Sequence, residues 1–442
     1  MTSQRTFITA LSVVAGVLGI FATQAVCGAS PAPSENMTLS PGGSGGGMII
    51  GVGVHRDRPD FDAERSDELV RQFGFTSIRD EIGQSADNAP GGLERSLMRG
   101  GRFSSPRNSG NAPNLYAVTG GGAAQFAHGI PLNNAELGSF DNFLGRLAGR
   151  IGTDRPIFEI WNEWNLPTRL RKAGTPDSYS ALVRSAIPAL RNAFPRSTIL
   201  AGSIGNDFTK SLGATSYWDW TRDYLAGGSW KQADGLSVHL YANCMAGTAR
   251  QPMSLIQRLT ELDGMVRADN GGRSFPVYVT EVGWPQQSGA CGFTQAERTA
   301  FPAQFLLMAE ALPFVRGVWL YELTDSRGDP RDIENTFGLA TADYAAKPSS
   351  CATAETIALL KTYRVTGVKI AGGVATASLQ SAGGGISVTW SADGNAHRVS
   401  LPAGTRAQPL CSAQDVNTGP LDLTILPQII YTGAPPVAPV LQ

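Results

Sequence analysis

The feature that most constrains the fold of this 442-residue chain is a regular alternation of apolar, β-rich runs with helical patterns. The runs predict eight strands, at 49–54, 76–82, 114–119, 156–162, 198–204, 235–241, 276–283 and 316–323. Apolar residues at helical spacing lie between several of them, at 62–73, 137–151, 175–194, 254–266 and 353–363. A capping box at Thr294 and Glu297 begins a further helix. Eight strands that alternate with helices predict a (β/α)8 TIM barrel, and a doubly wound parallel sheet is the alternative.

Beyond residue 364 the sequence changes character. Short alternating runs such as 386–390 replace the helical patterns, and turn residues separate them. This change predicts a barrel over 47–364 and a small all-β, sandwich-like domain over 365–442. We expect a structural role for this second domain, and carbohydrate binding is the alternative.

The N-terminus has the pattern of a secretory signal peptide over 1–27. Arg5 precedes an apolar run over 7–26, and small residues follow. An uncleaved membrane anchor is the alternative, since the run approaches the ~20 residues that span a bilayer. A lipid-modified Cys27 is disfavoured because the residue before it is not small. The stretch 28–46, rich in Ser, Pro and Gly, predicts a flexible linker. We expect export to the periplasm or extracellular space, with membrane attachment only if the leader is uncleaved.

Four cysteines follow the leader, namely Cys244, Cys291, Cys351 and Cys411. Export favours disulfides over buried free thiols, and four cysteines permit three pairings. Cys244 follows the sixth predicted strand and Cys291 the seventh, so both should lie on neighbouring loops at one face of the barrel. Cys351 begins the last barrel helix, whereas Cys411 lies in the β-domain. We predict the pairs Cys244–Cys291 and Cys351–Cys411, the second of which would join the two domains.

Composition and motifs exclude several classes of protein. The 36 Lys and Arg residues balance 37 Asp and Glu residues, so the chain lacks the basic surplus of a nucleic-acid-binding protein. No P-loop is present, and no GxGxxG follows a strand. We expect no metal and no organic cofactor, and we expect a monomer. The histidines are scattered rather than clustered, at His55, His128, His239 and His397.

Two predicted strands each end in a glutamate, Glu163 after 156–162 and Glu281 in 276–283. The C-terminal ends of all barrel strands surround one pocket, so the two carboxylates can face each other there. Two facing carboxylates are the minimal equipment for cleaving a glycosidic bond, one as proton donor and one as nucleophile. Aromatic and amide side chains that suit a sugar lie beside them: Trp161, Trp164, Trp284, Asn162 and Asn165.

These segments resemble a known family. Ile-Trp-Asn-Glu-Trp-Asn-Leu-Pro at 160–167 resembles the acid/base motif of clan A glycoside hydrolases, and Val-Thr-Glu-Val-Gly-Trp at 279–284 resembles the nucleophile strand of that clan. The segment 335–348, with its Gly-Leu and Lys-Pro, resembles the stretch after the eighth strand in family 39-like enzymes. These enzymes include exported hydrolases encoded with biofilm exopolysaccharide genes. The resemblance covers roughly 49–365.

The resemblance implies a retaining glycoside hydrolase that cleaves a polysaccharide or oligosaccharide by double displacement. Glu163 would be the acid/base and Glu281 the nucleophile. Arg79 would contact the nucleophile, unless it only forms a structural ion pair. Asn162 would bind the sugar 2-hydroxyl. The remaining implied contacts are Tyr241 near the nucleophile, His239 lining the pocket unless it is a core histidine, Tyr321 or Trp319 as sugar platform, and Trp164 and Trp284 as stacking surfaces.

Two alternative functions remain open from sequence alone. A transglycosylase on the same glycan would use the same residues, and a non-catalytic glycan-binding surface protein would need neither glutamate.

Glu159 shares the side-chain parity of Glu163, and we interpret it as a buried hydrogen-bonded partner. Glu322 is treated with the same caution. If Glu163 and Glu281 form one retaining site, their carboxyl groups should lie roughly 5–5.5 Å apart.

Overall fold

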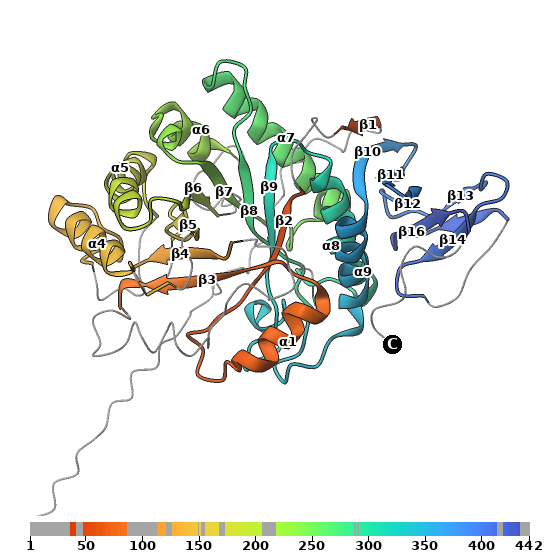
Figure 1. The fold of residues 1–442 in the computed structure, drawn as a ribbon, viewed down its shortest axis with the longest axis horizontal. Helices are drawn as coiled ribbons and strands as arrows, with labels where there is room; N and C mark the ends of the chain where they lie inside the picture. Colours follow the sequence, from red (N-terminus) through yellow and green to blue (C-terminus); the bar gives the residue numbers. More distant parts are fainter. Residues whose placement is uncertain are drawn as a thin grey trace, which may run out of the picture.

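The computed structural model describes residues 36–40, 47–85, 113–120, 126–148, 150–151, 155–167, 173–205, 218–286, 289, 291–412 and 419–433. Eight parallel strands form a closed barrel in chain order, with the last strand paired to the first (Figure 1). This closure confirms the TIM barrel and excludes the doubly wound sheet. The strands are β2 (Ile49–Gly53), β3 (Ser77–Gly83), β4 (Leu115–Thr119), β5 (Ile157–Ile160), β6 (Thr198–Ile204), β7 (Gly235–Leu240), β8 (Val277–Val282) and β9 (Val315–Leu320).

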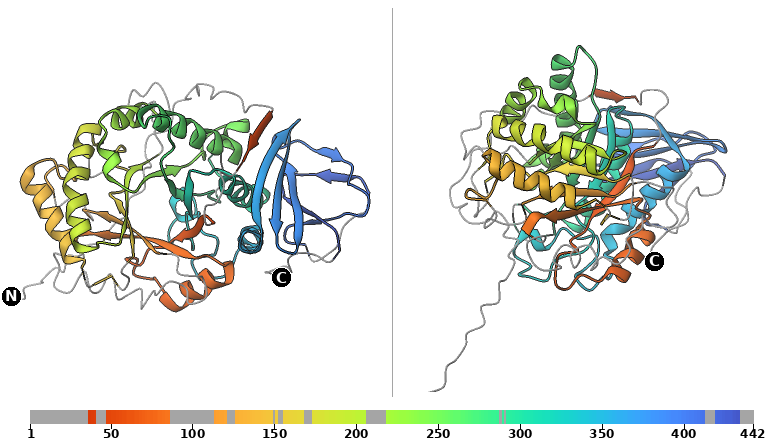
Figure 2. Two further views of the ribbon diagram at one scale, coloured as in Figure 1. Left: turned by 45° about the horizontal axis from the view of Figure 1, so that its top comes forward. Right: turned by 60° about the vertical axis from the view of Figure 1, so that its left-hand side comes forward.

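Helices surround the barrel, as both views in Figure 2 show. Side-chain caps fix several helix starts, including the capping box between Thr294 and Glu297. The helix over 219–226 was not predicted, because eight residues are too few for a clear apolar period and its N-cap residue, Trp218, makes no side-chain cap bond. The helices are α1 (Ala63–Phe73), α4 (Asn134–Arg146), α5 (Pro176–Ala193), α6 (Asp219–Ala226), α7 (Pro252–Asp269), α8 (Gln295–Glu310) and α9 (Cys351–Thr362).

The N-terminal end of the barrel interior is filled by an apolar cluster. Trp319 is fully buried there, and its Nε1 donates to Ser77 Oγ over 3.1 Å. A Cβ added at Gly51 would lie 2.2 Å from the Trp319 ring, so this glycine makes room for the indole. Trp319 therefore fills the barrel floor and is not the sugar platform. The cluster consists of Leu115, Ile157, Leu200 and Trp319, with Ile49 and Tyr278 packed against it.

An antiparallel β region follows the barrel. Six strands pair in the order β1-β10-β11-β12-β16-β14, and β13 pairs with β15. The first of these strands comes from the N-terminal segment. The strands are β1 (Asn36–Leu39), β10 (Arg364–Ala371), β11 (Val374–Ser381), β12 (Gly384–Ser391), β13 (His397–Val399), β14 (Arg406–Pro409), β15 (Leu421–Leu423) and β16 (Gln428–Tyr431).

Strand β1 corrects the prediction of a flexible linker over 28–46. Residues 36–39 pair antiparallel with β10, and Leu39 is buried in the core. Backbone pairing with an available sheet edge outweighs the low strand propensity of the flanking Ser, Pro and Gly residues. The composition of 28–46 does not reveal this pairing, because it depends on an edge more than 300 residues away along the chain.

Both predicted disulfides are present, Cys244–Cys291 and Cys351–Cys411. The second joins α9 to the β region, where Gln304 Nε2 also donates to the Ile425 carbonyl over 2.6 Å. Two disulfides fit a protein exported to an oxidising compartment. The predicted signal peptide over 1–27 lies outside the described residues. Within those residues, no helix has the length and apolar character needed to cross a membrane.

Candidate active site

Arg79 of β3 joins the polar groups at the C-terminal end of the barrel. Its Nη1 lies 2.7 Å from Glu281 Oε1, and its Nη2 lies 2.8 Å from both Glu159 Oε2 and Asn162 Oδ1. The side chain is only 6% exposed. Burial opposes its charge, but the carboxylates of Glu159 and Glu281 more than offset this and raise the pKa of Arg79 well above its ordinary value. Arg79 therefore holds a fixed positive charge against Glu281.

Glu159 of β5 is completely buried beside Arg79. Thr280 Oγ1 donates to its Oε1 over 2.7 Å, and Arg79 occupies its Oε2. Burial alone would raise the pKa of Glu159, but the Arg79 charge and the hydrogen bonds from His239 and Thr280 lower it to about 2. The interpretation of Glu159 as a buried hydrogen-bonded partner agrees with these contacts.

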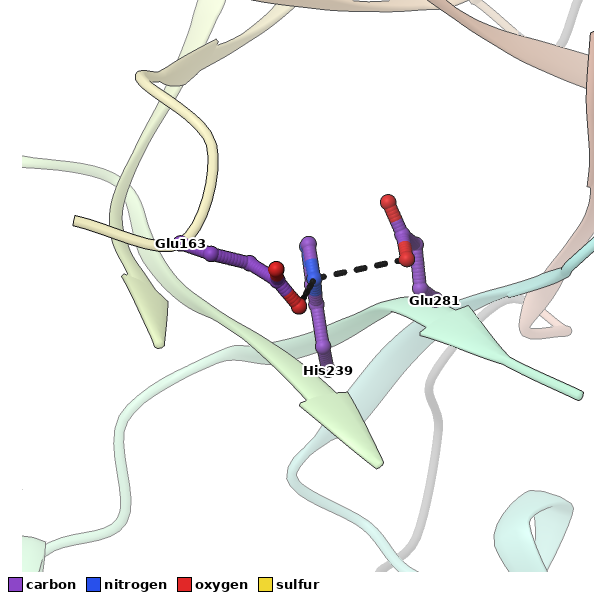
Figure 3. Close-up of side chains that lie close together, drawn as sticks. All are labelled: Glu163, His239 and Glu281. Atoms are coloured by element: carbon purple, nitrogen blue, oxygen red, sulfur yellow. Dashed lines mark hydrogen bonds and ion pairs between the residues drawn. The ribbon is translucent and has the colours of Figure 1, made fainter. Parts of the chain in front are cut away.

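His239 of β7 lies between the two glutamates named by the motifs (Figure 3). Its Nδ1 lies 3.0 Å from Glu163 Oε1 and 3.4 Å from Glu281 Oε2. The ring is fully buried, which opposes its charge, yet Glu281 and the hydrogen bonds to Glu159 and Glu163 raise the pKa of His239 to about 10. A protonated His239 can donate from Nδ1 to Glu163. His239 thus combines full burial, as in a core histidine, with hydrogen bonding to the partly exposed Glu163.

The two glutamates approach each other closely. One oxygen of each carboxylate and a ring nitrogen of His239 lie within 4.8 Å of one another. Three such atoms can in principle hold a metal ion, but the Arg79 guanidinium already occupies Glu281, and its charge disfavours a second cation there. The Glu163 side chain is 25% exposed and that of Glu281 is 10% exposed, so both remain partly accessible to solvent.

Tyr241 supplies a further donor to Glu281. Its hydroxyl donates to Glu281 Oε2 over 2.6 Å, so both oxygens of this carboxylate have strong partners. The Tyr241 ring meets Tyr321 and Phe337 edge to face, at centroid distances of 6.4 and 5.8 Å. Tyr321 is partly exposed and lies beside Tyr241, which binds Glu281.

The loop after β5 has a conformation that side chains rarely adopt. Trp161 and Glu163 have φ angles of 75° and 48°, in the left-handed region. Ser203 holds this loop, because its Oγ donates to the Trp161 carbonyl over 2.8 Å and accepts from the Glu163 amide over 2.9 Å. A Cβ at Gly205 would lie 2.9 Å from Glu163 Cγ. The strained backbone and the missing Cβ together aim Glu163 into the pocket.

Three residues expected to contact substrate have packing roles instead. Trp164 is fully buried, with its Nε1 donating to Ser178 Oγ, and Trp284 is 4% exposed and packs against Phe305. Asn165 exchanges two hydrogen bonds with the Gly205 backbone, at 3.2 and 2.8 Å. The expected stacking surfaces at Trp164 and Trp284 are therefore corrected. Both indoles are covered by aromatic partners, Trp164 by Trp161 and Tyr179 and Trp284 by Phe305 of α8.

Two groups near the pocket were missed or underrated by sequence reasoning. Glu322 is buried, and its Oε2 lies 2.9 Å from Arg58 Nη2 and 3.0 Å from His55 Nε2. Glu334 lies in the short helix η5 (Ile333–Asn335). Burial, followed by the negative charges of Glu163, Glu281 and Glu322, raises the pKa of Glu334 to about 8. Glu334 could have been noticed in the sequence, because it immediately precedes the segment 335–348 that resembles family 39-like enzymes.

Comparison with solved structures identifies the class of fold. A family 39 glycoside hydrolase from the gut symbiont Bacteroides cellulosilyticus WH2 has a TM-score of 0.65 and 21% identity, covering 87% of this chain and 81% of its own. The family 39 enzyme from Xanthomonas axonopodis pv. citri has a TM-score of 0.54 and 12% identity, with coverages of 87% and 94%. A GH30 endoxylanase from Clostridium papyrosolvens C71 has a TM-score of 0.52 and 11% identity, with coverages of 90% and 100%.

The chain thus has the fold of these glycoside hydrolases. The resemblance to family 39-like enzymes that the two glutamate motifs indicate is confirmed at the level of the fold. No protein-family model and no curated protein sequence matches the chain.

Proposed function

We propose that this protein is a retaining glycoside hydrolase that cleaves O-glycosidic bonds of a polysaccharide or oligosaccharide. Glu163 acts as acid/base and Glu281 as nucleophile. The observation that carries the proposal is the approach of one oxygen of each carboxylate to within 4.8 Å. Retaining enzymes hold their carboxyl groups roughly 5–5.5 Å apart, whereas inverting enzymes need ~6.5–9.5 Å to admit a water molecule.

The contacts of Glu281 support its role as nucleophile. Arg79 and Tyr241 each direct a donor at one of its oxygens, and this pair stabilises a carboxylate anion. Attack on the anomeric carbon forms the glycosyl-enzyme bond at one oxygen and neutralises the carboxylate. When water later breaks that bond, the same donors stabilise the departing anion, so they lower the barrier to the second displacement.

The position of Glu163 supports its role as acid/base. It is the more exposed of the two, and His239 Nδ1 lies 3.0 Å from its Oε1. In the first step Glu163 gives its proton to the leaving glycosidic oxygen, and in the second step it takes a proton from the attacking water. His239 can interact with either glutamate in both steps, because its Nδ1 lies close to Glu163 and to Glu281.

The proposal is tested by incubating the full-length mature protein with a panel of bacterial exopolysaccharides and plant glycans and measuring the reducing ends released. The wild type is compared with Glu163→Gln, Glu281→Gln and a matched control, Glu261→Gln, on the exposed face of α7. We expect release from at least one glycan by the wild type and the control, and loss with both site variants. Release that survives in Glu281→Gln would contradict the proposal.

Azide separates the two roles in the variants Glu281→Ala and Glu163→Ala. Without Glu281, azide attacks the sugar directly and gives a glycosyl azide of inverted configuration. Without Glu163, azide attacks the glycosyl-enzyme and gives the retained configuration. A substrate with a good leaving group is used, because it needs no proton from Glu163. Two products of one configuration would show that the roles are wrongly assigned.

We also propose that residues 1–27 direct export of the protein and are then removed by cleavage. The two disulfides support an oxidising destination. N-terminal sequencing of the protein recovered from its producing cells tests this proposal. A mature chain that begins near residue 28 is expected, and a chain that retains Arg5 in a membrane fraction would favour the anchor.

A further inference from the structure

Strand β6 contains a bulge beside the loop that carries Glu163. Between Ala201 and Ile204 the strand advances three residues, while its partners on β7 advance only two, from 236 to 238. The extra residue breaks the regular pairing, and Ser203 takes a φ angle of 43° within it. Because a bulge changes the direction of the side chains in it, Ser203 can point where a residue of a regular strand would not.

Two side chains fix this bulge to the neighbouring strands. The Tyr179 hydroxyl accepts from the Gly202 amide over 2.9 Å and donates to the carbonyl of Ile160, the last residue of β5, over 2.7 Å. On the other side, Ser237 Oγ of β7 accepts from the Ser203 amide over 2.8 Å. The position of Ser203 is therefore set by the barrel and not by a loop.

The Ser203 hydroxyl bridges two residues of strained backbone. It donates to the Trp161 carbonyl and accepts from the Glu163 amide, and both of these residues have left-handed φ angles. Such conformations persist only where the surroundings enforce them. Ser203 is fully buried and Trp161 nearly so, so loss of the hydroxyl would leave the Trp161 carbonyl without this buried partner.

Strand β7 holds Glu163 at both ends. Ser237 reaches the Glu163 backbone through Ser203. His239 follows two residues later on the same strand, and its Nδ1 lies 3.0 Å from Glu163 Oε1 (Figure 3). His239 is also in register with Glu281 of β8. The backbone and the carboxyl group of Glu163 are thus both fixed relative to the strand that pairs with the strand of Glu281.

We infer that Ser203 is a positioning residue for the proposed acid/base. Its hydroxyl fixes the backbone at Glu163, so that the carboxyl group is held where it can protonate the glycosidic oxygen while Glu281 attacks. This inference rests on the proposed function and adds a residue that acts only through Glu163. A displacement of about 1 Å in a catalytic group can cost about 100-fold in rate, so loss of this one hydroxyl should be measurable.

A displaced Glu163 should impair proton donation more than nucleophilic attack. In the first step Glu281 forms a bond to the anomeric carbon, the bond to the leaving oxygen breaks, and the proton of Glu163 passes to that oxygen. A strongly acidic leaving group departs without the proton, whereas a weakly acidic one needs it. The ratio of kcat/KM for the two kinds of substrate therefore reports on Glu163, and it does not depend on the fraction of enzyme that is folded.

The test measures this ratio with dinitrophenyl and phenyl glycosides of glucose, galactose, mannose and xylose, in both anomeric forms. Ser203→Ala and Ser203→Gly should each raise the preference for the dinitrophenyl substrate at least about tenfold over the wild type. Ser203→Gly is included because glycine accepts the left-handed backbone, which protects folding if Ser203→Ala is unstable.

The matched control is Ser197→Ala, just before the start of β6. It also removes a buried hydroxyl, which donates to the Phe194 carbonyl over 2.8 Å. This variant should keep the wild-type ratio, because Ser197 lies at the other end of the strand from Glu163. A general loss of stability would lower both rates and leave the ratio unchanged.

Crystal structures of the wild type, Ser203→Ala and Ser197→Ala give a second readout that needs no substrate. In Ser203→Ala the Glu163 carboxyl group should move by about 1 Å or more relative to His239, and in Ser197→Ala it should stay in place. An unchanged kinetic ratio in both Ser203 variants, or a Glu163 carboxyl group at its wild-type position in Ser203→Ala, would overturn the inference.

The same measurements separate this inference from the proposed function. Hydrolysis with one constant ratio in all variants would uphold the hydrolase and end the role of Ser203. If the protein cleaves polysaccharides but none of the aryl glycosides, the crystal structures decide. If no sugar is released from any substrate, the proposed function fails, and a displaced Glu163 in Ser203→Ala crystals would still uphold its positioning by Ser203.

Discussion

The two ends of one barrel differ in what their side chains do. At the N-terminal end Leu115, Ile157, Leu200 and Trp319 fill the interior with apolar volume. Towards the C-terminal end, strands of the same barrel carry Arg79, Glu159, His239 and Glu281, in a network of ion pairs and hydrogen bonds. The floor gains its free energy from burial and packing. The polar end gives up apolar burial in order to hold charged groups in fixed positions.

The backbone repeats this contrast. Strands β4 and β5 pair in a continuous register, whereas left-handed φ angles occur at Trp161, Glu163 and Ser203 near the two glutamates. Such conformations cost of order 1–3 kcal/mol each and persist only where the surroundings enforce them. Stability should therefore respond to changes at the floor, and chemistry to changes at the polar end.

The largest effect is expected from Glu281→Ala, which removes the proposed nucleophile. Turnover should fall by at least about 10⁴-fold, because no covalent intermediate can form. The free energy of unfolding should fall less than for truncation of the floor, because buried Arg79 loses Glu281 but keeps Glu159 as its partner. Initial rates and urea unfolding measure the two effects. Near-normal turnover, or a large loss of stability with proportionate loss of rate, would break the comparison.

The reverse behaviour is expected for Trp319→Ala at the floor. Removal of this indole should lower the free energy of unfolding by about 3–5 kcal/mol through the cavity it leaves. Ser77 Oγ keeps its bond to the Pro113 carbonyl, so the hydroxyl is not orphaned. Urea denaturation gives the stability, and kcat per folded molecule at low temperature should match the wild type. A variant that is stable but inactive would show that the two ends are not separable.

A smaller effect is expected from removing one tyrosine hydroxyl. Tyr241 follows the C-terminal end of β7, and Tyr278 lies near the N-terminal end of β8. Tyr241→Phe deletes the donor to Glu281 and should lower kcat by about 10- to 100-fold, the scale of one hydrogen bond to a charged group. Tyr278→Phe, its matched control against the floor cluster, should leave kcat unchanged. Equal kcat losses in the two variants would mean that the Tyr241 hydroxyl has no special role.

The smallest effect is a pH dependence of stability. The folded pKa of His239 is raised to about 10, above its unfolded value of ~6.5, so its stabilisation is full below pH 6.5 and declines as pH rises towards 10. The Tm of the wild type should therefore fall over this window more than that of His239→Asn. Trp319→Phe, which leaves the polar end intact, should keep the wild-type slope. Parallel curves for the wild type and His239→Asn would refute a charged His239.

Most of the fold could be predicted from the sequence because barrel strands are apolar and their order follows the chain. All eight predicted strands lie within a few residues of those observed. The failures have local reasons. Strand β1 depends on pairing with β10, a contact between distant parts of the chain, and α6 is too short to show a period. Disulfides followed from topology, because the loops after β7 and β8 are neighbours.

The positions of the candidate-site residues were predicted where these residues lie on strands and missed where they depend on the direction of a loop. Arg79, His239 and Glu281 lie on strands, so alternation fixes which way they point. Trp164 and Trp284 lie on loops, and their burial depends on turns that no local pattern encodes. Glu334 lies 14 residues beyond the end of β9, so only the folded loop brings it to the pocket.

The central claim is that Glu163 and Glu281 form one double-displacement site, and the stereochemistry of the wild-type reaction tests it most directly. A proton NMR time course should follow the first sugar released from a glycoside of known anomeric configuration, before mutarotation. The account predicts that the first product has the configuration of the substrate, because two inversions restore it. A first product of the opposite configuration would require a water molecule between the two carboxylates and would contradict their observed approach to within 4.8 Å.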